Sequence, residues 1–255
     1  MKPKALVLQA HGSNRDFDVI EAFALAGADT TGIPLNELRK DKTLLSEFQM
    51  LVIPGGFSYA DALGAGKLLA LDLQSYFADE ISAFVQSGKP VIGICNGFQA
   101  LVKSGILPGN NDGATLTYNA RGHFECRWVT LKPVSQKCIW TRELHDLIEC
   151  PIAHGEGNFQ TSDLFPFSSF VENDQIALAY GCADGSPANG EYPENPNGSI
   201  LDIAGICNPQ GNVLGLMPHP ENHIHPHQHP QWTRGVCRRS GLALFKSGVK
   251  YAAET

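Results

Sequence analysis

The stretch Pro-Val-Ile-Gly-Ile-Cys-Asn-Gly-Phe-Gln, residues 90–99, decides how we interpret this sequence. Its first half is a short apolar run rich in β-branched residues, which is typical of a buried strand. The run ends at Cys95, and residues compatible with a helix follow. Gly93 and Gly97 bracket the cysteine in a G-x-C-x-G pattern, the cysteine counterpart of the G-x-S-x-G nucleophile elbow. Small flanking residues let the chain turn sharply there, so the pattern predicts a cysteine exposed at the edge of a sheet.

A cysteine in such an elbow gains reactivity from the helix that follows it. The N-terminus of a helix stabilises a thiolate. The N–H of Asn96 can also point at an oxyanion that develops when Cys95 attacks a substrate. A buried, unreactive cysteine before a glycine-rich turn has the same pattern. The elbow alone therefore leaves both interpretations open.

The residues before this elbow alternate between apolar runs and amphipathic segments. The runs that predict strands are residues 4–9, 28–35, 50–53 and 90–94, and the segments that predict helices are residues 17–27, 44–48 and 66–88. This alternation is the signature of a right-handed, doubly wound parallel sheet. We expect an α/β fold with a mostly parallel central sheet and helices on both faces.

The second half of the chain has a different character. Short segments rich in β-formers are residues 115–118, 124–131, 139–141, 148–153 and 175–180, followed by a predicted hairpin of residues 199–206 and 212–217. These segments predict antiparallel or mixed strands beside the parallel sheet. We expect one domain over residues 1–255. Its residues 222–255 form a C-terminal extension with a histidine-rich loop and a final helix over about residues 235–251.

Two further motifs follow predicted strands. Pro54-Gly55-Gly56 ends the strand at residues 50–53, and glycines at the carboxyl end of a parallel strand allow close backbone approach to a ligand, although an ordinary tight turn also fits. Pro218-His219-Pro220-Glu221 follows the last strand. In an extended segment Glu221 would lie on the same side as His219 and could orient its imidazole, as in a catalytic triad; a solvated pair is the alternative. Because both motifs fall at strand ends with Cys95, they favour a common site.

Composition excludes several classes of partner. The formal net charge is −7, with 19 Lys and Arg against 26 Asp and Glu, and no basic stripe alternates with aromatic residues. We therefore expect no binding to nucleic acid or to a membrane surface. The apolar start of the chain is too short for a signal peptide. The seven cysteines form no C-x-x-C pair, which favours free thiols in the cytoplasm over disulfides or structural zinc.

The motifs carry a family resemblance. Residues 54–56, 93–99 and 218–221 resemble the three signatures of class I glutamine amidotransferases. More narrowly, residues 55–59, 95–99, 124–128, 152–157 and 215–221 are similar to the glutaminase subunit of phosphoribosylformylglycinamidine synthase. The resemblance runs from Lys4 to Glu221 and implies a flavodoxin-like fold. Ala60 stands where this family more often has Gly, a departure that constrains the loop without touching a catalytic group.

The resemblance also implies roles for individual residues. Cys95 would attack the side-chain amide of L-glutamine to form a thioester, His219 would protonate the leaving ammonia and activate water, and Glu221 would fix the tautomer of His219. The backbone N–H groups of Gly56 and Asn96 would form the oxyanion hole. Residues implied to bind glutamine are Gly55, Phe57, Gln99, His154 and Glu156. No metal ligand is implied.

In such a family the ammonia passes to a large synthetase subunit during de novo purine biosynthesis, and a small accessory subunit belongs to the same complex. ATP and Mg²⁺ are expected on the large subunit and no cofactor on this chain, which has no G-x-x-x-x-G-K-[ST] phosphate loop. A glutaminase serving another synthase is the first alternative. A cysteine hydrolase or chaperone of the stress-protein type usually has its histidine close after the cysteine, whereas Asn96 follows here. An inactive regulatory subunit is disfavoured because Cys95, His219 and Glu221 are all present.

The remaining histidines and cysteines receive simpler interpretations. His223, His225, His227 and His229 alternate, so an extended strand would bring them to one face that could bind a transition metal. A solvated polar loop is the interpretation that we favour. We interpret the cysteines other than Cys95 as packing or incidental thiols, namely Cys126, Cys138, Cys150, Cys182, Cys207 and Cys237.

Overall fold

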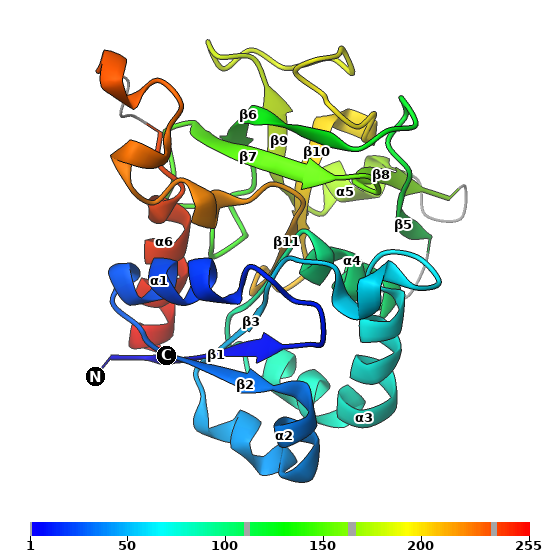
Figure 1. Cartoon of the computed structure of the whole chain (residues 1–255), viewed down its shortest axis with the longest axis vertical. Helices are drawn as coiled ribbons and strands as arrows, with labels where there is room; N and C mark the ends of the chain where they lie inside the picture. The colour runs from blue at the N-terminus through cyan, green and yellow to red at the C-terminus, as the bar shows by residue number, and fades with distance from the viewer. Residues whose placement is uncertain (1, 110–112, 163–166, 236–238) are drawn as a thin grey trace.

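A nine-stranded sheet runs through the molecule, as the computed structural model in Figure 1 shows. The structure describes residues 2–109, 113–162, 167–235 and 239–255. In spatial order the strands are β2 (Asp29–Pro34), β1 (Lys4–Gln9), β3 (Met50–Ile53), β4 (Val91–Ile94), β11 (Val213–Leu216), β10 (Ile203–Cys207), β9 (Ile176–Gly181), β6 (Glu125–Pro133) and β7 (Ile148–His154). The first five are parallel, and each of the remaining four is antiparallel to its neighbour. The predicted doubly wound sheet with added antiparallel strands is confirmed.

Helices cover both faces of the parallel half. They are α1 (Asp16–Ala26), α2 (Leu35–Lys40), α3 (Lys67–Gln86), α4 (Asn96–Lys103) and α6 (Leu242–Glu254), whereas α5 (Ser168–Glu172) lies beside β8 (Asn158–Thr161), outside the parallel half. The chain leaves β1 in one direction along the sheet and β3 in the other, so right-handed connections place α1 and α3 on opposite faces. Figure 1 shows α1 and α6 together on one side, with α3 and α4 on the other. A small separate sheet pairs β5 (Ala114–Thr117) with β8.

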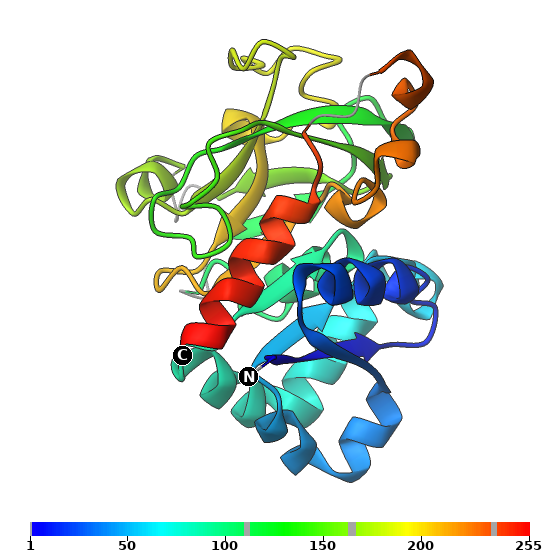
Figure 2. The same ribbon diagram turned by 90° about the vertical axis from the view of Figure 1, so that its left-hand side faces the viewer.

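Three aromatic residues explain how the C-terminal helix joins the core. Figure 2 shows α6 beside α1. Phe23 of α1 lies edge-on to Phe245 of α6, with ring centroids 5.2 Å apart. Phe23 also meets Trp140, and Gly248 leaves room for that indole because a Cβ there would lie 2.1 Å from the Trp140 ring. α1 ends at Gly27, whose φ of 105° is the left-handed conformation that favours glycine.

Glycines let α4 pack unusually close to the sheet. A Cβ on Gly97 would lie 2.0 Å from the carbonyl oxygen of Ile53. A Cβ on Gly215 would lie 2.1 Å from the Phe98 ring, and one on Gly93 would lie 2.5 Å from Leu101. Such distances are far below van der Waals contact, so these glycines are required for the position of the helix that follows Cys95.

Several predicted elements differ from the observed ones. Residues 139–141 form turns instead of a strand; Trp140 is fully buried and donates to the carbonyl oxygen of Asn212, so its apolar character reflects burial. The final helix begins at Leu242, because a 3-10 turn over Trp232–Arg234 ends at Gly235 with a φ of 79°. Of the helix predicted at residues 44–48, residues 44–47 belong to a 3-10 helix, Lys42–Glu47, and Phe48 is extended. The elements α2, α5 and β8 were not predicted, because each is too short to show a clear period.

No helix in the described part of the chain combines the length and hydropathy needed to cross a membrane.

Candidate active site

Three adjacent parallel strands bring the predicted motifs to one edge of the sheet. β3, β4 and β11 are neighbours, with Ile53 opposite Gly93 and Gly93 opposite Gly215. The residues that follow these strands must therefore emerge at the same edge. This register explains how segments far apart in sequence meet around Cys95.

Cys95 lies in a sharp turn between β4 and α4. Its φ of 51° and ψ of −106° are outside the conformations usual for a non-glycine residue, and α4 begins at the next residue, Asn96. The predicted strand–elbow–helix is therefore confirmed. The prediction that Cys95 is exposed is wrong, because only 5% of the residue is accessible. It lines a cavity of about 170 Å³ instead of standing free at the surface.

His219 and Glu221 form a buried pair beside Cys95. The Nδ1 atom of His219 lies 2.6 Å from Oε1 of Glu221, and Glu221 is completely buried. The prediction that residues 218–221 are extended is wrong, because Glu221 lies in a 3-10 turn over Pro220–Asn222. The turn, together with a bond from the His219 N–H to the carbonyl oxygen of Pro151, brings the carboxylate to the imidazole.

The side chain of Cys95 acts directly on His219, and Sγ of Cys95 lies 3.9 Å from the carbonyl oxygen of Ala153. Burial alone would lower the pKa of His219, but the Glu221 carboxylate and Cys95 outweigh it and raise this pKa to about 10. At neutral pH His219 therefore holds the proton that a leaving amine would need. Gly55 packs against both residues, since a Cβ there would lie 2.8 Å from Cε1 of His219 and 3.5 Å from Cβ of Cys95.

The loop after β3 presents its backbone to the same cavity. Gly56 has a φ of 141°, and the loop is fastened by a bond from the Phe57 N–H to the carbonyl oxygen of Gly12 and by one from the Asn14 N–H to that of Gly55. Within the described residues, the N–H groups of Gly56 and Asn96 make no hydrogen bond to the protein. Both donors are thus free for an oxyanion, and their role stays a prediction.

The cavity collects most of the predicted substrate residues. Those that line it are Gly56, Phe57, Cys95, Gln99, His154 and Glu156. The predicted site residues Gly55, Asn96, His219 and Glu221 are not among those that line it. Residues of the cavity wall that sequence reasoning did not single out include Asp61, Ala65 and Tyr118. Asp61 ends the glycine-containing loop, and its proximity in sequence to Gly56 was the one available signal.

Gln99 and Glu156 hold the cavity wall together. Nε2 of Gln99 donates to the carbonyl oxygen of Glu156 at 2.7 Å, and its Oε1 accepts from Nδ2 of Asn96 at 3.2 Å. The Glu156 carboxylate accepts from the N–H of Ala65 and lies 3.6 Å from Nζ of Lys103. Both ends of the Gln99 amide are therefore hydrogen-bonded within the protein. Its predicted contact with glutamine stays a prediction.

His154 is a neutral imidazole. Its Nδ1 lies 3.1 Å from Oδ1 of Asn119 and carries the proton, because that oxygen is an acceptor. Burial, and then the nearby His219, lower the pKa of His154 to about 3. Its Nε2 is a buried acceptor without a partner in the described part of the chain.

The histidine-rich segment folds differently from both interpretations of its sequence. It is not extended, because a 3-10 turn covers Pro226–Gln228. His223 and His229 are buried with their rings against Trp128, so the solvated-loop interpretation is wrong for these two. The described residues contain no cluster of three His, Cys, Asp or Glu side chains suited to a metal ion.

The cysteines outside the elbow are unpaired where the structure describes them. Cys138, Cys150 and Cys207 are buried and Cys126 is exposed. Cys237 lies outside the described residues.

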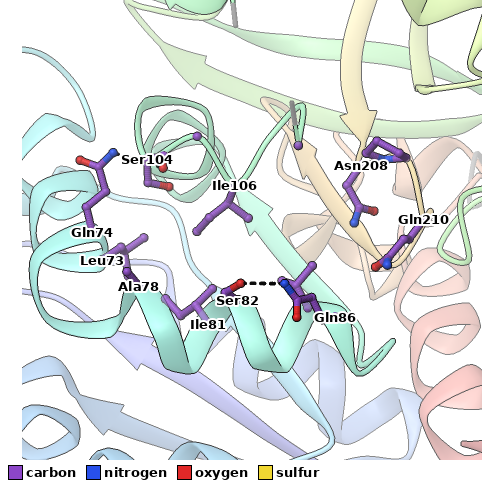
Figure 3. A pocket seen from close by; sticks show the side chains of 14 residues that line it. Leu73, Gln74, Ala78, Ile81, Ser82, Gln86, Ser104, Ile106, Asn208 and Gln210 are labelled. Carbon is purple, nitrogen blue, oxygen red and sulfur yellow. Dashed lines mark hydrogen bonds between the residues drawn. The ribbon is translucent and has the colours of Figure 1, made fainter. Parts of the chain in front are cut away.

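A larger cavity, of about 590 Å³, lies away from the predicted residues (Figure 3). Leu73, Ile81 and Gln86 of α3 form one wall, and Asn208 and Gln210 of the β10–β11 turn face them. Those turn residues precede β11, so this cavity lies at the amino ends of the strands, opposite Cys95. It contains none of the predicted site residues.

Comparison with known proteins agrees with this arrangement. The model of the CobB/CobQ-like glutamine amidotransferase domain matches residues 2–252. The phosphoribosylformylglycinamidine synthase subunit PurQ of Treponema denticola is 54% identical, over 98% of this chain and 99% of its own length. The subunit of the same name from Dehalococcoides mccartyi is 42% identical, with 99% of both chains covered. Among solved structures, a chain of PurLQS from Thermotoga maritima superimposes with a TM-score of 0.74 at 31% identity, covering 98% of this chain and 99% of that one.

Proposed function

The chain belongs to the CobB/CobQ-like glutamine amidotransferase family, and we propose that Cys95, His219 and Glu221 are the triad with which it hydrolyses glutamine for phosphoribosylformylglycinamidine synthase. One observation carries the assignment of the triad. A cysteine in a strained elbow lies beside a buried histidine, both packed around Gly55, and Nδ1 of that histidine lies 2.6 Å from a buried carboxylate. This is the order of contacts that nucleophile, base and orienting group require.

The reaction follows from these contacts. Sγ of Cys95 attacks the carboxamide carbon of glutamine while its proton resides on His219. The N–H groups of Gly56 and Asn96 hold the oxyanion of the tetrahedral intermediate; one such donor is typically worth about 3–4 kcal/mol. His219 then donates its proton to the leaving nitrogen, which departs as ammonia and leaves a thioester.

Water completes the cycle. His219, now neutral, removes a proton from a water molecule that attacks the thioester, and Cys95 leaves as the second tetrahedral intermediate collapses. Glutamate is released, and the proton again lies between His219 and Cys95. Glu221 keeps the proton-transferring nitrogen of His219 directed at the sulfur throughout.

The ammonia is used by a partner. As a phosphoribosylformylglycinamidine synthase subunit, the chain works with the large synthetase subunit in purine biosynthesis, which fits its similarity to a chain of PurLQS. We assign ATP and Mg²⁺ to the large subunit, because the sequence has no phosphate-binding loop of the G-x-x-x-x-G-K-[ST] type. We also propose a small accessory subunit and a cytoplasmic location, the latter because the six described cysteines are free.

Substitution of the nucleophile tests this proposal. Cys95→Ala should abolish glutamine hydrolysis and glutamine-dependent synthesis by the reconstituted complex, while synthesis driven by added ammonium chloride continues. Cys126→Ser, at an exposed cysteine outside the cavity, is the matched control and should retain both activities. Glutamine hydrolysis by a folded Cys95→Ala variant would remove Cys95 from the mechanism. Failure to sustain amidine synthesis with the large subunit would instead indicate another synthase.

A further inference from the structure

We propose that Asp61 binds the α-ammonium group of glutamine and so makes the site selective for a free amino acid. The proposal rests on the proposed function, since it concerns the cavity in which Cys95 would meet its substrate.

Asp61 is a carboxylate without a cation. It lines the cavity of Cys95 and is partly buried. Its Oδ1 accepts from Nδ2 of Asn96 at 3.0 Å, and the backbone N–H of Gly66 also donates to it. In the described part of the chain no Lys, Arg or His nitrogen lies within 4.0 Å of its oxygens. A carboxylate partly removed from water in this way gains from a cationic partner.

The charges around the cavity leave one negative charge unbalanced. Asp61 and Glu156 are the two carboxylates that line it. Lys103 pairs with Glu156 at 3.6 Å and donates to the carbonyl oxygen of Ala65. Burial raises the pKa of Asp61, and the charge of Glu156 raises it by a smaller amount. A ligand that places an ammonium group beside Asp61 would therefore pair with its carboxylate.

Glu156 is the less suitable partner for that charge. Its oxygens already accept from the N–H of Ala65 and face Lys103. Asp61, by contrast, has neutral hydrogen-bond donors, and the charge of Lys103 acts on it without a direct ion pair in the described part of the chain.

The position of Asp61 also fits the length of glutamine. Four bonds, or roughly 5 Å in an extended side chain, separate the carboxamide carbon from the α-nitrogen. Oδ1 of Asp61 accepts a hydrogen bond from the side chain of Asn96, the residue that follows Cys95. The carboxylate of Asp61 therefore lies close to Cys95 and to one side of it. An amide carbon at Cys95 thus leaves the α-nitrogen within reach of Asp61.

The test compares two substrates in the reconstituted complex. One is L-glutamine, and the other is 4-carbamoylbutanoate, which lacks only the α-amino group. Asp61→Asn removes the charge but keeps an oxygen for Asn96, and asparagine tolerates the φ of 53° found at this position. We expect the KM for glutamine to rise about tenfold to a hundredfold with kcat little changed, and the KM for 4-carbamoylbutanoate to stay the same.

Each other outcome overturns the proposal. An equal effect on both substrates would show that Asp61 only positions Asn96. A glutamine-specific effect in Glu156→Gln but not in Asp61→Asn would assign the ammonium to Glu156. Equilibrium binding of both compounds to Cys95→Ala and to Cys95→Ala/Asp61→Asn gives the same comparison without turnover. Absence of glutamine hydrolysis by the unsubstituted complex would refute the proposed function itself, whereas hydrolysis without a selective Asp61 effect refutes this inference alone.

Discussion

Replacement of Gly55 by alanine tests how tightly the loop after β3 confines His219, the proposed proton-transferring residue. The added methyl carbon would lie 2.8 Å from Cε1 of His219 and 3.5 Å from Cβ of Cys95. Carbon atoms in ordinary contact are about 3.5–4.0 Å apart, so the imidazole must move by roughly 1 Å. It cannot move freely, because its Nδ1 is held 2.6 Å from the buried Glu221. The substitution therefore pushes His219 away from the position that serves Cys95.

The expected effect is larger on catalysis than on folding. A misplacement of about 1 Å in a catalytic group can cost about a hundredfold in rate, so we expect kcat for glutamine hydrolysis to fall about tenfold to a hundredfold. Overpacking of a buried site costs about 1–3 kcal/mol, which should appear as a lower free energy of unfolding in urea. Ammonia-dependent synthesis by the complex should be unchanged, because it does not use Cys95.

Gly32→Ala is the matched control. A Cβ on Gly32 would also approach another atom to 2.8 Å, but that atom is Nε2 of Gln9, the far end of a flexible side chain outside the site. It should retain the kcat of the unsubstituted chain. If folded Gly55→Ala retains that kcat as well, the loop does not confine His219 and the geometric argument is refuted.

Three further predictions concern other residues of the site. Glu221→Gln should lower kcat by at least about a hundredfold, because the carboxylate that orients His219 is lost. It should also move the high-pH limb of the activity profile toward neutrality, since Glu221 helps to raise the pKa of His219 to about 10. An unchanged pH profile would contradict this. Ala60 is exposed and has a φ of 54°, so Ala60→Val should lower the free energy of unfolding by about 1–2 kcal/mol through backbone strain while Ala60→Gly does not, as urea titrations can measure. The pKa of His154 falls from 6.5 to about 3 on folding, so the unfolded chain binds more protons between these pH values and stability is lost as the pH drops through them, by at most about 1.4 kcal/mol per pH unit. His154→Gln should make the free energy of unfolding less dependent on pH. Parallel curves of this free energy against pH for the two proteins would disprove the assignment.

The alternation of apolar runs was sufficient to predict the first four parallel strands, and the three motifs were sufficient to predict that Cys95 and His219 lie near one another; β11 was predicted as part of a hairpin, and its parallel pairing with β4 was not foreseen. These features are local. A short stretch of sequence is enough to indicate the backbone conformation of each: the β-branched run at β4, the glycines around Cys95, and the spacing of His219 and Glu221. Adjacency of β3 and β4 was predicted because they are successive strands of one sheet, whereas the place of β11 beside β4 came from the structure.

What lies around those residues depended on contacts between distant segments. Trp140 is buried against Phe23 and α6, and the short turn that contains it has no hydrophobic period from which this burial could be predicted. His223 and His229 are buried because Trp128 of β6 lies against them. Asp61 gains its importance only from a cavity that β4, β7 and the loop after β3 build together. The sequence by itself determined which residues are candidates for catalysis, since candidates are recognised by residue type and local turn. The tertiary structure decided burial and charge balance, because both depend on what the rest of the chain brings within a few ångströms.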